Sequence, residues 1–101
     1  MKEVDRKSFV HFLLICSPQQ FKYTLKTLTK NQLQVIVEII FNVMKGICPI
    51  SDKNKTKQYK RKRLIREVIL PKLTPEQRKR RLKKHKRVLP IFLEACLKHG
   101  P

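Results

Sequence analysis

The sequence predicts an all-α protein, a compact bundle of four or five helices that forms a single helical domain over residues 1–101. Apolar residues recur at helical spacing in successive segments of the chain. The chain holds two glycines and no tryptophan, which argues against an all-β sandwich with many tight turns. Its 41% hydrophobic content supplies a core, and 101 residues suit one domain.

The first two predicted helices are separated by a proline. Residues 6–16 form the first, with apolar side chains at helical spacing: Phe9, Phe12, Leu13 and Cys16. Ser17 is a favourable N-cap residue and Pro18 suits the first position of a second, short helix. The apolar side of this second helix carries Phe21, Leu25 and Leu28.

The third predicted helix, about residues 31–45, is apolar on nearly every side. Thr29 can cap it, Gly46 ends it, and its polar breaks form one narrow stripe, Gln34, Glu38 and Asn42. A helix that is apolar all round is buried, yet a chain this small has little other protein to cover it. We therefore expect that this helix either lies at the centre of the bundle or is partly covered by a second copy of the protein. The residues predicted for that oligomer interface are Leu33, Ile36, Val37, Ile40 and Met44.

A loop over 47–56 and two basic helices follow. The first basic helix runs from about 57 to 70, where Pro71 ends it. Thr74-Pro75-Glu76-Gln77 then starts the second, with an N-cap, a proline at the first position and a glutamine that completes a capping box. Because proline breaks a helix interior, we expect a kink or a fresh helix at Pro90. The segment beyond it is apolar: Phe92, Leu93, Cys96 and Leu97.

The charge is strongly asymmetric. Residues 1–50 hold seven Lys and Arg against three Asp and Glu, a net charge of +4. Residues 51–101 hold eighteen against four, a net charge of +14 of the total of +18. This division predicts an apolar folding or assembly half, 1–50, and a basic, nucleic-acid-binding half, 51–101.

Two basic blocks, residues 57–63 and 78–87, contain no acidic residue. A face that is merely solvated normally mixes charges of both signs, so acid-free blocks favour a polyanion as the partner. Together with one neighbouring arginine, they give the predicted nucleic-acid-binding residues Lys57, Lys60, Arg61, Lys62, Arg63, Arg66, Arg78, Lys79, Arg80, Arg81, Lys83, Lys84, Lys86 and Arg87.

Contacts to phosphates, more than to bases, are expected of these residues. Block 78–87 has no Asn or Gln to recognise adenine, and Tyr59 is the only aromatic residue near either block. A helix-turn-helix of 57–70 and 76–89 is conceivable, although its turn would hold Pro71 and Pro75 and no glycine.

No enzyme, cofactor or metal site is predicted. The acidic residues near the basic blocks lie singly, and two glycines cannot build a phosphate-binding loop. Cys16, Cys48 and Cys96 are far apart without a CxxC pair, which indicates a reducing compartment and no secretion. No run approaches the ~18 apolar residues of a membrane span.

Several segments resemble a small reading frame of Polinton-like (Maverick) and adintovirus-type DNA elements of animals. They are Ser17-Pro18-Gln19-Gln20, Thr29–Asn42 (TKNQLQVIVEIIFN), Met44-Lys45-Gly46 and Pro49-Ile50-Ser51, followed by the Lys/Arg-rich tail. The resemblance covers about residues 12–90. It departs at Arg87-Val88-Leu89-Pro90, where such frames often have a Gly-Gly-Phe-Leu-Pro-like turn. It implies a virion-associated or genome-condensing protein that works in the nucleus, and names no catalytic residue.

We therefore expect a small basic protein that binds DNA rather than RNA, without sequence preference, and condenses or packages it in a nucleus or virion. The basic runs also resemble a nuclear import signal, which is compatible with that function. An oligomeric structural or scaffolding protein that lines a capsid is the alternative. An RNA- or ribosome-associated protein is a further alternative.

Overall fold

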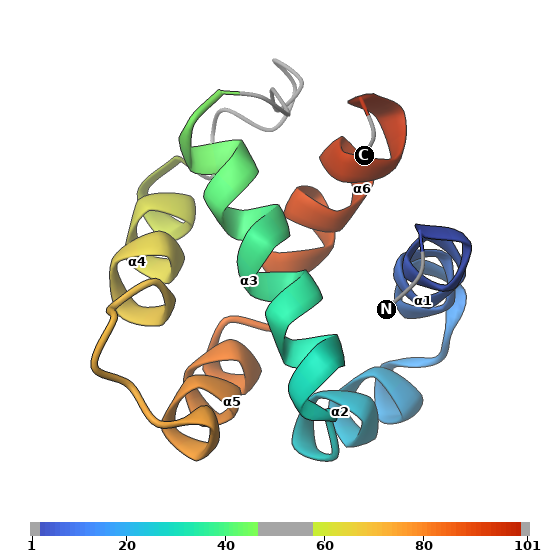
Figure 1. Ribbon diagram of the computed structural model, residues 1–101, viewed down its shortest axis with the longest axis horizontal. Helices are drawn as coiled ribbons and strands as arrows, with labels where there is room; N and C mark the ends of the chain where they lie inside the picture. Colours follow the sequence, from blue (N-terminus) through green and yellow to red (C-terminus); the bar gives the residue numbers. More distant parts are fainter. Residues whose placement is uncertain (1–2, 47–57, 100–101) are drawn as a thin grey trace.

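The computed structural model describes residues 3–46 and 58–99, with side chains for residues 6–46 and 62–98. These ranges hold six α-helices and no strand, which confirms the all-α prediction (Figure 1). In chain order they are α1 (Glu3–Ile15), α2 (Pro18–Lys26), α3 (Lys30–Met44), α4 (Gln58–Val68), α5 (Pro75–Lys84) and α6 (Leu89–His99). The loop predicted over 47–56 lies outside the described residues.

The helix count exceeds the predicted four or five because the last predicted helix is divided in two. α5 ends at Lys84, and a turn over 85–88 leads into α6, whose second residue is Pro90. Pro90 has no N–H to donate to a preceding turn, so it fits only near a helix start. The fresh helix is thus confirmed, and the break comes before the proline, at His85.

Three helices begin with the same reciprocal pair of hydrogen bonds. Ser17, Thr29 and Thr74 each accept from the backbone N–H three residues later, at 3.1–3.2 Å. In return, the glutamine at that position accepts from the cap N–H at 3.0 Å. These capping boxes satisfy backbone groups that a helix start otherwise leaves unpaired. They fix the starts of α2, α3 and α5.

α3 crosses the middle of the molecule and packs against α4, α5 and α6 (Figure 1). α1 packs against α6, and α2 against α5. All six helices contribute to one apolar cluster, whose most enclosed members include Leu25, Ile36, Ile39, Ile40, Leu64, Leu82 and Phe92. Phe92, Leu93 and Cys96 of the apolar tail are buried as expected, whereas Leu97 is 38% exposed.

The structure corrects part of the predicted oligomer interface. Leu33, Ile36 and Ile40 are at most 5% exposed, because helices of the same chain cover them. They are core residues, so they cannot form a surface against a second copy. Val37 is half-buried at the edge of the core, and Met44 is exposed.

Candidate nucleic-acid interface

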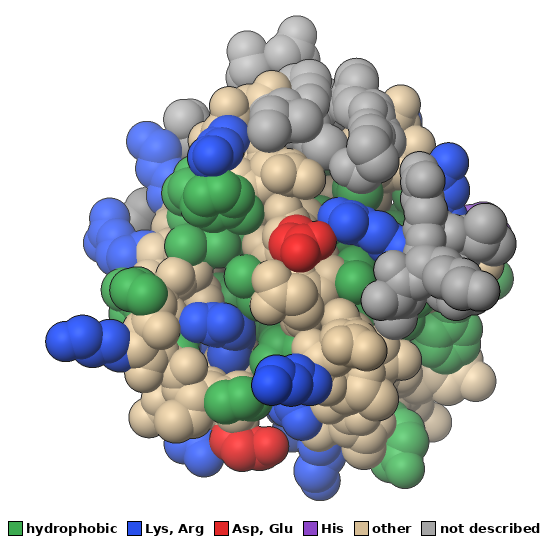
Figure 2. Space-filling model, viewed as in Figure 1, with side chains coloured by type: hydrophobic (Ala, Val, Ile, Leu, Met, Phe, Trp, Pro, Cys, Tyr) green, Lys and Arg blue, Asp and Glu red, His purple; other side chains and the backbone are tan. Residues whose placement is uncertain are grey.

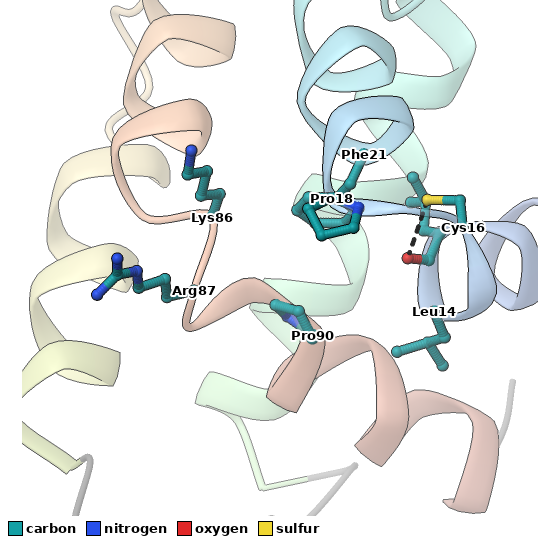
Figure 3. Close-up of a pocket in the computed structure, with 8 residues that line it drawn as sticks. Leu14, Cys16, Pro18, Phe21, Lys86, Arg87 and Pro90 are labelled. Atoms are coloured by element: carbon teal, nitrogen blue, oxygen red, sulfur yellow. Dashed lines mark hydrogen bonds between the residues drawn. The ribbon is translucent and has the colours of Figure 1, made fainter.

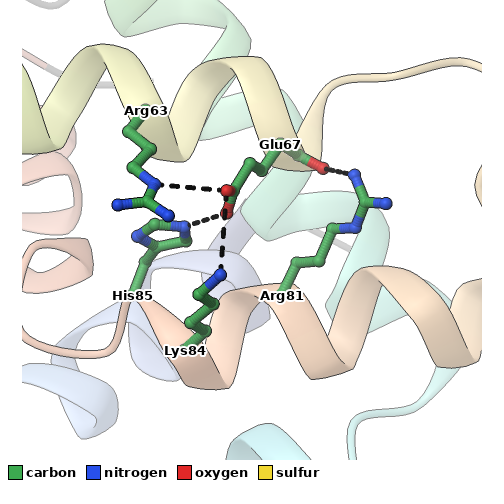
Figure 4. A network of polar contacts seen from close by, with 5 residues as sticks. All are labelled: Arg63, Glu67, Arg81, Lys84 and His85. Carbon is green, nitrogen blue, oxygen red and sulfur yellow. Dashed lines mark hydrogen bonds and ion pairs between the residues drawn. The ribbon is translucent and has the colours of Figure 1, made fainter.

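A polar network joins the two basic helices, α4 and α5 (Figure 4). At its centre is the carboxylate of Glu67, on α4. Arg63 Nε donates to Glu67 Oε1 at 3.3 Å, and Lys84 Nζ lies 3.9 Å from the same oxygen. His85 Nε2 contacts the other oxygen, Oε2. One acidic side chain therefore holds three basic side chains together across the α4–α5 contact.

Two arginines of α5 bind the backbone at the end of α4. Arg81 Nη1 donates to the carbonyl oxygen of Glu67, and Arg78 Nη2 to that of Leu70, each at 2.8 Å. The last carbonyl groups of a helix have no partner within it. A positive charge there also interacts favourably with the negative end of the helix dipole. Arg78 and Arg81, two of the predicted nucleic-acid-binding residues, thus join α5 to the last turn of α4 and to the residues that follow it.

The neighbours Arg80 and Arg81 provide a test of this role. Arg81→Gln removes the donor from the Glu67 carbonyl and should lower the free energy of unfolding by about 2 kcal/mol. Arg80→Gln changes an exposed side chain without a partner among the described residues and should alter it by less than about 0.5 kcal/mol. Urea denaturation of both variants measures the difference. Equal losses would show that the backbone contact of Arg81 contributes nothing.

The network also lowers the pKa of Glu67. The hydrogen bond from His85 is the largest cause, burial opposes it, and the hydrogen bond from Arg63 lowers the pKa further. Since the carboxyl group has a lower pKa in the folded chain, it stabilises the fold above its ordinary pKa of 4.5. That contribution begins to be lost as the pH falls below 4.5. It is gone once the pH is below the lowered pKa that the carboxyl group has in the folded chain.

Glu67→Gln should therefore make the protein less stable at pH 7 and remove this acid-dependent contribution. The difference in the free energy of unfolding between wild type and variant should shrink as the pH falls below 4.5. Glu76→Gln is the control, because the Glu76 side chain is 78% exposed and its one partner among the described side chains is Lys79, at 3.6 Å. A wild type–Glu67→Gln difference that stays constant with pH would contradict a role for the ionised carboxylate.

Six of the predicted nucleic-acid-binding cations have no partner among the described side chains. Among the residues with described side chains, they form no ion pair or side-chain hydrogen bond with another residue, and we call them the open cations: Lys62, Arg66, Arg80, Lys83, Lys86 and Arg87. Lys83 is half-buried and the other five are exposed. Lys57 lies outside the described residues, and the side chains of Lys60 and Arg61 are not among those described.

The acidic side chains, in contrast, are all engaged within the described part of the chain. Glu38 pairs with Arg6 at 3.1 Å and Glu94 with Lys98 at 3.6 Å, in addition to the contacts of Glu67 and Glu76. None of them pairs with an open cation. Figure 2 shows Lys and Arg side chains projecting at the left margin, over α4, and at the lower margin, over α5 and α2.

The sequence predicted the cationic helices but missed Glu67 and His85. Both lie among basic residues in the sequence, where a single acidic residue or histidine does not predict a particular contact. One signal was present, because Arg63 and Glu67 are four residues apart and such pairs meet on a helix surface. The contacts of Glu67 to α5 depend on tertiary packing and leave no local pattern.

The described residues hold neither a metal site nor a membrane-spanning helix. Within residues 3–46 and 58–99, no group of three or more His, Cys, Asp or Glu side chains could hold a metal ion. No helix there is both long and apolar enough to span a bilayer. The chain matches no protein-family model, no curated protein sequence and no solved structure.

Proposed function

We propose that this protein binds DNA through phosphate contacts of α4, α5 and the turn after α5, without sequence preference, and so condenses or packages it. One observation carries the proposal. The open cations form no ion pair with a described acidic side chain, while every described carboxylate is already paired within the chain. A net charge of +18 on 101 residues opposes the compact state by self-repulsion, and a polyanion relieves that repulsion.

The local geometry supports phosphate contacts over base recognition. Arginine recognises guanine and glutamine recognises adenine by paired hydrogen bonds in the major groove. Arg78 and Arg81 instead bind backbone carbonyls, and Gln77 is engaged in the capping box with Thr74. Gln77 and these two arginines are therefore engaged within the chain, while the open arginines Arg66, Arg80 and Arg87 can bind phosphates, so affinity is expected to come mainly from charge.

DNA as the partner, and a nucleus or virion as the location, follow from the resemblance of residues 12–90 to reading frames of Polinton-like DNA elements. A chain that condenses a genome needs affinity for any sequence, which phosphate contacts provide. Titration of the protein with an RNA duplex would show whether it also binds RNA.

The salt dependence of binding to unrelated DNA duplexes tests the proposal. With the six open cations each releasing one counterion, log K should fall against log salt concentration with a slope of about −5. Affinities for different sequences should agree within a few-fold. A slope near zero, or a preference above about a hundredfold for one sequence, would contradict phosphate-dominated binding.

An assembly function is the second candidate, favoured by an uncovered apolar strip on α3. Val37, Phe41 and Met44 lie on one side of this helix, and Phe41 and Met44 are 38% and 44% exposed. Lys45 Nζ lies 4.5 Å from the centre of the Phe41 ring. Sedimentation that shows a dimer without nucleic acid would support assembly of copies through this strip, and a monomer at high concentration would contradict it.

A further inference from the structure

A cleft of about 420 Å³ opens between the α1–α2 junction and the turn that joins α5 to α6. Leu14, Cys16 and Pro18 line one wall, and Lys86, Arg87 and Pro90 line the other (Figure 3). Its volume falls within the roughly 300–1,000 Å³ typical of sites for small ligands. The cleft brings together segments about seventy residues apart in the chain, beside two of the open cations.

The interior of the cleft is apolar, and one of its walls carries two cationic residues, Lys86 and Arg87. Leu14, Pro18 and Pro90 offer only apolar side chains, and the Cys16 thiol donates to the carbonyl oxygen of Leu13 at 3.6 Å. In Figure 3 the charged ends of Lys86 and Arg87 point away from Cys16 and Pro18. A ligand that fits has an apolar body for the interior and negative charge attached close to it, within reach of Lys86 and Arg87.

We propose that this cleft receives an unpaired base of a single-stranded nucleic acid, whose adjoining phosphates bind Lys86 and Arg87. The proposal rests on the proposed function, since both cations belong to the open set. An unpaired base can leave its stack and enter a pocket between apolar side chains, whereas a base in an intact duplex cannot. Charge alone favours the duplex, which has the denser phosphates. If the cleft contributes, the affinity for a single strand should therefore be higher than its phosphate charge alone predicts.

Leu14→Glu and Ile15→Glu form a matched pair that tests the cleft. Both change the net charge equally, but Leu14 lines the cleft and Ile15, 68% exposed, does not. Leu14→Glu should weaken binding of a single-stranded oligodeoxythymidylate on the order of tenfold more than Ile15→Glu does. Binding of a duplex of the same length should fall equally in both variants. Equal effects of the two variants on the single strand would overturn the proposal.

Alkylation of Cys16 gives a second test, on the unaltered chain, which holds even if Leu14→Glu fails to fold. Peptide mass spectrometry follows the modification of Cys16, which is half-buried in the cleft wall. Saturating oligodeoxythymidylate should slow alkylation at least several-fold, and saturating duplex should not. Equal rates with both ligands would overturn the proposal.

Two further outcomes separate this proposal from its alternatives. If dodecanoate protects Cys16 and the oligonucleotide does not, the cleft takes an anionic amphiphile and the proposal is wrong. If duplex binding shows the expected salt slope but Cys16 stays unprotected by the single strand, only the cleft assignment fails. If neither nucleic acid binds, the proposed function itself fails.

Discussion

Ile36→Glu is expected to unfold the protein, whereas Val37→Glu, one residue along the same helix, is expected to leave it folded. Ile36 is fully enclosed by helices of its own chain, and a carboxylate there would lie in the apolar core. Burying an unpaired charge costs more than the few kcal/mol of stability of a small domain. Val37 is half-buried at the edge of the core, where a longer charged side chain can reach water.

Far-UV circular dichroism and urea denaturation measure this difference. The Ile36→Glu chain should lack a cooperative unfolding transition, while Val37→Glu should keep one near that of wild type. A soluble, folded, monomeric Ile36→Glu protein would mean that Ile36 lies at a contact between chains and not in the core. The pair therefore decides how α3 is covered.

Charge reversal on the basic helices is expected to have the largest effect on binding. Arg66→Glu combined with Arg80→Glu replaces one open cation on α4 and one on α5. The affinity for duplex DNA at about 0.1 M salt should fall on the order of a hundredfold, because four units of positive charge are lost near the phosphates. Neither side chain has a partner among the described residues, so the fold should persist.

Lys22→Glu combined with Lys26→Glu is the control for that experiment. It makes the same change in net charge on two exposed lysines of α2, outside both basic blocks. Its affinity should fall only several-fold, as expected from the overall charge. Equal losses in the two double variants would show that net charge, and not the α4–α5 surface, governs binding.

Local signals predicted most of the helix boundaries. Ser17, Thr29 and Thr74 were expected as N-caps, and each caps its helix. Gly46 was expected to end α3, and it has φ +80°, a backbone conformation that side chains disfavour. Caps and glycine stops act through neighbouring residues only, so a single sequence contains the information.

The cover over α3 could not be predicted, because it depends on tertiary packing. The polar stripe of Gln34, Glu38 and Asn42 was visible, and Gln34 and Glu38 are exposed. The sequence does not show which helices enclose Ile36 and Ile40. Burial within the chain and an interface with a second copy were therefore equally consistent with the apolar pattern of α3. The division of the cations was hidden for the same reason: nothing local distinguishes Arg80 from Arg81.

The most direct test that the open cations bind phosphate is the salt slope of duplex binding. It is compared between two double variants in which uncharged glutamine replaces two cations. Arg66→Gln with Arg80→Gln should flatten the slope of log K against log salt concentration by about two from its wild-type value of about −5. Lys22→Gln with Lys26→Gln should leave the slope unchanged. A slope that flattens equally in both variants, or in neither, would contradict the assignment of phosphate binding to α4 and α5.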